Sequence, residues 1–321
     1  MSGGPIQERA PLLAAEAAGA AVPGGSPAAA FRRRFLRHPL AVGALALLLL
    51  IAAASAGEPL VEQWLGFGAE QIDLLARSAP PSAAHPLGTD ELGRDLLLRL
   101  LRGGRVSLGV GFAAALVAAT IGTVVGLVAG YLGGRVDALL MRLVDSVIAL
   151  PLLPLLIVMA AVDLTKLGIP QSVADSGSAS LWRIVLLVAL VGWTTTARLV
   201  RGTVLSLKAR EYVRAAEALG AGPLRILRRH ILPNALSPVI VATTLSVGNV
   251  ILIESVLSFL GLGIQPPLPS WGNMLTGAQE TIWSAPMLAV WPGLAIFVTV
   301  IAANFLGDGL QDALDPRTDR R

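Results

Sequence analysis

Long apolar stretches with almost no charge constrain this chain more than any other feature of its sequence. One of them, Pro39–Gly57, contains no charged residue and approaches the ~20 residues that a helix needs to cross a bilayer core. Five further stretches follow at residues 106–134, 146–162, 181–200, 238–262 and 286–307. Because lipid cannot satisfy backbone polar groups, such stretches favour helices. The sequence therefore predicts an all-α polytopic membrane protein with six transmembrane helices.

The composition excludes several other classes of protein. Hydrophobic residues make up 54% of the chain and charged residues 14%, against about 45–50% and about 25% in ordinary globular proteins. The sequence has no cysteine, and its three histidines lie in segments that cannot converge, so we expect no metal site. It has no G-x-x-x-x-G-K-[ST] phosphate loop, and its basic residues form no aromatic-interleaved patch for nucleic acid. We therefore expect a non-catalytic chain with no cofactor of its own.

The distribution of arginine predicts the orientation in the membrane. Most basic residues, including the cluster Arg32–Arg37 and a dense set between residues 198 and 229, fall in segments that are cytoplasmic if the N-terminus is inside. Six spans then place both termini in the cytoplasm. The predicted organisation is a disordered cytoplasmic tail (1–38), a first transmembrane helix (39–57), an extracytoplasmic segment (58–105), a core transmembrane domain (106–308) with a cytoplasmic loop (203–235), and a cytoplasmic tail (309–321).

Four arginines depart from this bias and fall on the predicted outer side. They are Arg94, Arg99, Arg102 and Arg105. They alternate with leucines and follow a group of acidic residues that begins at Asp90. This pattern predicts an amphipathic helix that lies in the membrane interface, with its acidic residues in the first turn.

The loop between the fourth and fifth stretches predicts two short helices. Tyr212, Ala215, Ala216 and Leu219 recur at a spacing of three to four residues and form one face of the first helix. Gly220 is suited to end that helix. From spacing alone, the loop is either a basic anchor at the membrane surface or a docking surface for a second protein.

The second short helix begins with a sequence that favours helix initiation. Gly222-Pro223 places proline at the first helical position. The predicted apolar stripe of this helix consists of Leu224, Leu227 and Ile231. Pro233 is predicted to stop it before the next membrane span begins near Pro238.

The same loop resembles the EAA loop of ABC-importer permeases, whose pattern is Glu-Ala-Ala, three residues, Gly, nine residues, Ile, one residue and Leu-Pro. Ala215, Ala216, Gly220, Leu232 and Pro233 stand at the matching positions. Arg214 stands where the pattern has glutamate and His230 where it has isoleucine; we expect Glu211 and Ile231 to take over these roles. The resemblance implies coupling to an ATPase through Glu211, Tyr212, Ala215, Ala216, Gly220, Ile231, Leu232 and Pro233.

Two further segments resemble the C-type permeases of dipeptide, oligopeptide and nickel importers. They are His85–Asp95 and Glu254–Met274, and the resemblance as a whole covers residues 30–315. It implies the type I ABC-importer permease fold in a bacterial inner membrane, and inward transport of a peptide-like solute. The implied partners are a homologous second permease, two ATPase subunits that bind ATP and magnesium, an extracytoplasmic solute-binding protein and the lipid bilayer.

Three ionisable residues in the predicted spans are candidates for the translocation path. Arg142 and Asp145 lie three residues apart, a spacing that predicts an ion pair on one helix face, whereas Glu254 lies alone in the fifth span. A structural role and a place on the path remain alternatives for each. An ion-coupled secondary transporter that works without ATPases is the rival function, and it would use such residues to bind protons or sodium ions. A membrane hydrolase is a third class, for which no nucleophile–base pair is visible on the spans.

Overall fold

Five helices in the described residues are long and apolar enough to cross a membrane, and a broken pair supplies a sixth span. The computed structural model describes residues 27–174, 176–276 and 278–314. The five long helices are α3 (Pro39–Ala56), α5 (Leu96–Leu132), α9 (Gly177–Lys208), α12 (Leu232–Phe259) and α14 (Met287–Leu314). The broken span consists of α6 (Gly134–Ile148) and α7 (Leu152–Ala160), whose axes differ by 83°. The predicted all-α fold is therefore confirmed.

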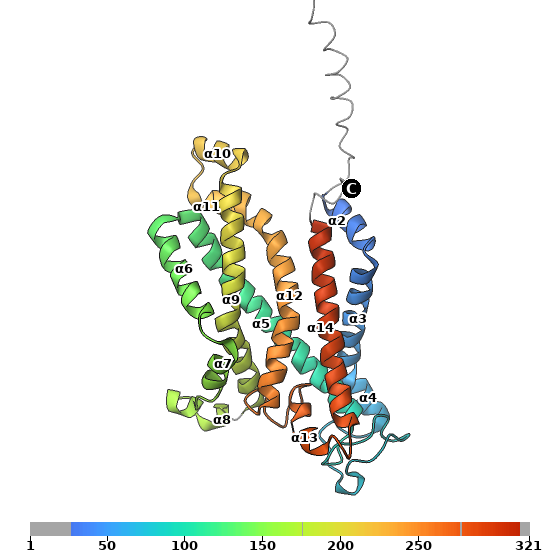
Figure 1. Ribbon diagram of the computed structural model, residues 1–321. Coiled ribbons are helices and arrows are strands. Elements are labelled where there is room, and N and C mark those ends of the chain that lie inside the picture. Colours follow the sequence, from blue (N-terminus) through green and yellow to red (C-terminus); the bar gives the residue numbers. More distant parts are fainter. Residues whose placement is uncertain (1–26, 175, 277, 315–321) are drawn as a thin grey trace, which may run out of the picture.

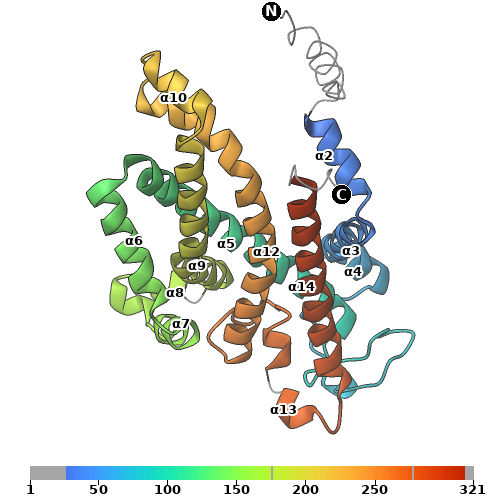
Figure 2. The same ribbon diagram turned by 45° about the horizontal axis from the view of Figure 1, so that its top comes forward.

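Shorter helices gather at the two ends of the bundle. They are α2 (Pro27–Leu36), α4 (Glu58–Leu65), α8 (Gln171–Ala174), α10 (Glu211–Ala218), α11 (Pro223–Ile226) and α13 (Ala278–Thr281). Figure 1 shows α10 and α11 at one end, together with α2 and the last turns of α14. The helices α4, α7, α8 and α13 lie toward the opposite end (Figures 1 and 2). Both ends of the described chain thus lie on the side of the bundle that carries α10.

Close packing of α5 against α9 forms the centre of the bundle. Gly122, Gly126 and Gly130 recur every four residues on α5, and a Cβ on any of them would lie within 2.7 Å of an atom of α9. Small residues at this spacing let helix backbones approach closely in a membrane. Beside this contact, α12 packs against α5, and α14 packs against α12 and α3.

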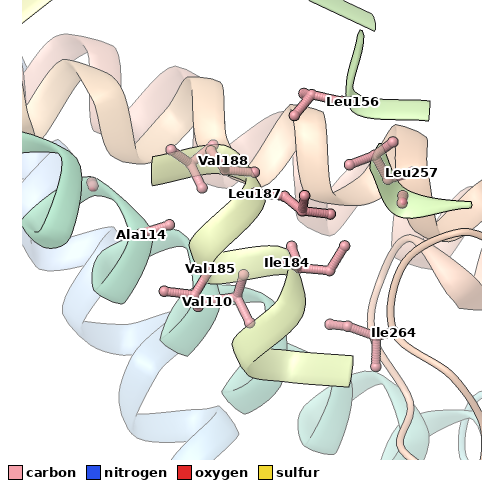
Figure 3. Packing of buried hydrophobic residues seen from close by; sticks show 12 residues of the cluster. Val110, Ala114, Leu156, Ile184, Val185, Leu187, Val188, Leu257 and Ile264 are labelled. Atoms are coloured by element: carbon pink, nitrogen blue, oxygen red, sulfur yellow. The ribbon is translucent and has the colours of Figure 1, made fainter. Parts of the chain in front are cut away.

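A buried apolar cluster joins α5, α7, α9 and α12 (Figure 3). Val110 and Ala114 of α5 belong to this cluster together with Val185 and Val188 of α9, while Leu156 attaches the short helix α7 to the bundle. The Arg183 side chain of α9 also donates to the backbone oxygen of Ala160, the last residue of α7, and to that of Val162, two residues beyond it. The broken span is therefore a fixed part of the bundle.

The predicted tails are shorter in the structure than in the sequence analysis. Pro27–Leu36 form α2, whose alanines, arginines and leucine favour a helix and which packs against α14. At the other end, α14 continues six residues past the predicted boundary at Asp308, to Leu314. The remaining parts of the two predicted tails, 1–26 and 315–321, lie outside the described residues.

The prediction of a separate interfacial helix around Arg94–Arg105 is wrong. Residues from Leu96 onward form the first turns of α5, and the Asp95 carboxylate caps that helix by accepting from the backbone nitrogen of Leu98 at 2.8 Å. Leu98 is buried, and the buried Arg99 donates to Glu70 at 3.0 Å. The alternation of arginine and leucine therefore reflects the first turns of α5, which pack against the segment between α4 and α5, and not a separate helix.

Candidate functional site

The helical hairpin formed by α10 and α11 projects from the end of α9 (Figures 1 and 2). Gly220 has a φ angle of 82°, in the left-handed region, where glycine is favoured. The reversal is closed by a hydrogen bond from the nitrogen of Ala221 to the oxygen of Ala216 at 3.0 Å. Pro223 then begins α11. The predicted helix break and restart are both present.

The inner side of the hairpin is attached to the membrane bundle. Val213 of α10 and Ile226 of α11 are buried in one apolar cluster with Val200 and Val204 of α9. Tyr131, at the end of α5, belongs to the same cluster, and its backbone oxygen accepts from the Lys208 ammonium group at 2.8 Å. Movement of the hairpin must therefore move the ends of α5 and α9.

The outer side of the hairpin exposes apolar side chains among charged ones. Leu219 is 89% exposed and Leu224 is 66% exposed, while Tyr212 and Ala215 are also on the surface. The predicted face of α10 thus points away from the bundle. Exposed apolar side chains beside small residues and a charged Glu211 are typical of a protein docking surface.

The structure places Ile231 and His230 in different surroundings. Ile231 is fully buried, so it cannot offer an apolar contact to a partner. His230, at the position where the EAA pattern has isoleucine, lies against Tyr212 with 6.2 Å between ring centroids. Ile231 therefore packs in the apolar cluster beneath the hairpin and His230 packs within the hairpin; that Ile231 takes the role of the pattern's isoleucine stays a prediction.

The prediction that Pro233 stops the second helix is also wrong. A π-helical turn at Leu227–Ile231 joins α11 to α12, and the nitrogen of Leu232 bonds to the oxygen of Leu227. Pro233 lies in the first turn of α12, where its missing N–H is tolerated. The wider π turn also rotates the apolar stripe. Ile226 and Ile231 are therefore buried, while the predicted stripe member Leu224 is exposed.

The predicted ion pair between Arg142 and Asp145 does not form. Asp145 pairs instead with Arg198 of α9, at 2.5 Å between Oδ1 and Nη2. One helical turn along α9, Arg201 donates to both carboxylate oxygens of Asp137. Two ion pairs therefore connect α6 to α9. The sequence analysis did not single out Asp137, Arg198 or Arg201, because the two members of each pair are 53 and 64 residues apart in the sequence.

Glu254 lies at the centre of a buried polar cluster. Its carboxylate accepts from Ser258 at 2.7 Å and from Ser107 of α5 at 3.2 Å. The Ser107 hydroxyl also accepts from the backbone nitrogen of Trp271, whose indole nitrogen donates to the oxygen of Leu100. Glu254 thus joins α12, α5 and the loop before α13. It is fully buried within this chain, which favours the structural alternative.

Glu254→Ala is therefore expected to destabilise the subunit. It leaves buried hydroxyl groups without an acceptor, at a cost of about 1–3 kcal/mol. Glu254→Gln retains one acceptor and should have a smaller effect. Thermal unfolding of the purified subunit measures both changes. Wild-type stability of the alanine variant combined with loss of transport would contradict the structural role and favour the path.

Comparisons with known proteins agree with this architecture. Residues 122–320 match the family described as binding-protein-dependent transport system inner membrane component. The chain is 44% identical over 288 residues to the oligopeptide transport system permease protein OppC of Escherichia coli (strain K12), covering 89% of this chain and 90% of that protein. It is 43% identical over 289 residues to the glutathione transport system permease protein GsiD of Pectobacterium atrosepticum, covering 89% and 90%.

A solved structure shows the same fold. The inward-facing MetNI methionine ABC transporter matches with a TM-score of 0.53 and 20% identity, over 68% of this chain and 98% of that chain. The family match covers more than half of the chain, and both curated relatives match it along nearly their whole length. The chain belongs to the family of binding-protein-dependent transport system inner membrane components.

Proposed function

We propose that this chain forms half of the translocation pathway of an ATP-driven importer for peptides or a related solute. The names of the two curated relatives support this solute class, because one is a permease for oligopeptides and the other a permease for glutathione, itself a peptide. A homologous second permease forms the other half of the pathway. Two ATPase subunits bind ATP and magnesium, and an extracytoplasmic binding protein delivers the solute.

The exposed apolar surface of the α10–α11 hairpin carries this proposal. Leu219 and Leu224 offer a docking surface, and the buried side chains of Val213 and Ile226 connect it to the bundle. When the ATPase subunits close on ATP, they move the hairpin, and the hairpin moves α9 and α12 on either side of it. The solute pathway then opens alternately to the two sides of the membrane.

The predicted coupling residues divide into two groups in this mechanism. Glu211, Tyr212, Ala215, Ala216 and Gly220 lie on the hairpin surface, exposed or half-buried, and contact the ATPase. The buried Ile231, with the half-buried Leu232 and the exposed Pro233 beside it, forms the joint between the hairpin and α12.

We place the hairpin and both termini in the cytoplasm. Two observations support this orientation. The hairpin and the described ends of the chain lie at the same end of the bundle (Figure 1), and the segments at this end carry most of the arginines.

Reconstitution in lipid vesicles tests the proposed function. The chain alone should transport nothing, whereas the complete complex with its binding protein should take up peptides only with ATP. Gradient-driven uptake by the chain alone would establish the secondary-transporter alternative. ATP-driven uptake of a solute other than a peptide would retain the mechanism and replace the solute class.

A further inference from the structure

Helix α6 presents three different faces, and one of them is both charged and exposed. Val144 is fully buried and packs, with Met141, against Ala189 and Trp193 of α9. A second face is apolar and exposed, with Leu139 at 72% exposure and Val136 and Leu143 beside it. The third face is a stripe of exposed residues at alternating spacings of three and four. Its members are Arg135, Ala138, Arg142, Asp145 and Ala149.

The charged stripe cannot face lipid in a folded transporter. The side chain of Asp145 is 62% exposed and that of its partner Arg198 is 50% exposed. Among the described residues, Arg142 has no ion-pair partner. Charged groups within membrane spans face water-filled cavities or other protein groups because their transfer to lipid is costly. The exposed apolar face of α6, by contrast, is suited to lipid.

The position of the break in this span points to water. The stripe runs from the end of the bundle that carries α10 toward the turn between α6 and α7 (Figure 1). At that turn the axis bends by 83°, and Ala149, Leu150 and Pro151 are exposed. Backbone that leaves the helical pattern within a membrane is tolerated where it is buried in protein or lines a water-filled cavity. Because these residues are exposed in the chain and follow directly on an exposed charged stripe, a cavity accounts for both features.

We propose that the stripe Arg135–Ala149 of α6 lines the aqueous solute pathway, and that Asp145 and Arg198 contact charged groups of the solute there. This inference rests on the proposed function and specifies the part of the chain that faces the solute. The chemistry fits a solute that carries both an ammonium group and a carboxylate. Such a solute can exchange partners with the ion pair, ammonium to Asp145 and carboxylate to Arg198, so that no charge is left unpaired during passage.

Single cysteines on neighbouring residues test the location of the stripe. The natural chain has no cysteine, so each introduced thiol is unique within it. Ala138→Cys lies on the stripe, and Leu139→Cys, one residue later, lies on the exposed apolar face and is the matched control. In the assembled transporter in vesicles, a charged, membrane-impermeant thiol reagent supplied on the hairpin side should modify the cysteine at 138 at least about tenfold faster than that at 139. Trapping with ATP and vanadate should change the rate at 138 and leave that at 139 unchanged.

Two results would overturn the inference. Protection of residue 138 in every state of the complex, with rapid modification in the isolated subunit, would show that the second permease covers the stripe. Equal modification of 138 and 139 would place the whole of α6 outside the bilayer. Peptide uptake by the wild-type complex is measured in vesicles of the same preparation. ATP-dependent uptake there shows that the proposed function holds, so that either labelling result then counts against the location of the stripe alone.

The charges of the solute provide a second test, which a merely structural ion pair would not pass. Asp145→Asn should favour acidic peptides over basic peptides relative to the wild type, and Arg198→Gln should shift the ratio the other way. Each shift is expected to be about tenfold in the ratio of maximal uptake rates, measured with the binding protein saturated by each peptide. Unchanged ratios, with the two variants altering only thermal stability, would show that the pair is structural and would overturn its contact with the solute.

Discussion

Leu219→Asp is expected to release the ATPase subunits from the transporter and to abolish most ATP-dependent uptake. Leu219 is the most exposed apolar side chain of the hairpin, at 89%. A carboxylate in place of this leucine would be buried without a partner in an apolar contact, and a loss of about 2 kcal/mol, the size of an interface hot spot, corresponds to about 30-fold in affinity. Co-purification of the ATPase subunits with the variant, and peptide uptake by the same complex, measure the effect.

The control for this prediction is a matched leucine at the other end of the molecule. Leu75 is fully exposed and lies in the segment between α4 and α5, outside the hairpin. Leu75→Asp should retain the ATPase subunits as the wild type does. Because neither side chain packs in the bundle, both variants should keep the wild-type melting temperature. Full ATPase retention by the Leu219 variant would remove the hairpin surface from the interface.

Gly126→Ala is expected to loosen the contact between α5 and α9 and so to destabilise the whole subunit. The added Cβ would lie 2.6 Å from the backbone oxygen of Ala197 and 2.7 Å from the Cβ of Val200. Neither atom belongs to a flexible side-chain end, so the two helices must move apart. Overpacking of this kind costs about 1–3 kcal/mol, and thermal unfolding in detergent should show a melting temperature lower by about 2–4 °C for each kcal/mol lost.

Substitution of another glycine on the same helix is expected to leave the stability of the subunit unchanged or to raise it. Gly109 of α5 is exposed, and a Cβ there would meet no atom within 4 Å. Gly109→Ala should be neutral or stabilising by up to about 1 kcal/mol, because alanine favours the helix. Equal effects of the two substitutions would show that helix propensity, and not the approach of α5 to α9, governs the stability at these positions.

The membrane spans follow closely from the sequence because their signal is local. The uncharged stretch Pro39–Gly57 became α3 almost residue for residue. The predicted ends of the helices were wrong where packing extends a helix beyond its apolar residues. The last turns of α14, after Asp308, are held by contacts such as that of Gly309 with Ala41. Hydropathy carries no information about such contacts.

The hairpin was predictable for the same reason, since its turn and its helices lie in one short segment. The side chains that face the bundle were harder to predict. The π turn at Leu227–Ile231 shifts the helical register by one residue, and no clear pattern in the sequence indicates such a turn. The ion pairs of α6 were missed because their partners on α9 are distant in sequence. Asp145 and Arg198 are 53 residues apart, and Asp137 and Arg201 are 64 residues apart.

Protection of the hairpin surface is the most direct measurement of the central claim, that α10 and α11 receive the ATPase. Leu219→Cys provides a unique thiol, because the chain has no cysteine. The rate at which a soluble maleimide modifies this thiol is compared between the isolated subunit and the assembled complex. A short bifunctional reagent is then added to the complex, and cross-links from this thiol to other subunits are identified. The account predicts at least about tenfold slower modification in the complex, with cross-links to the ATPase subunit. Equal rates in both forms, without cross-links to the ATPase, would contradict it.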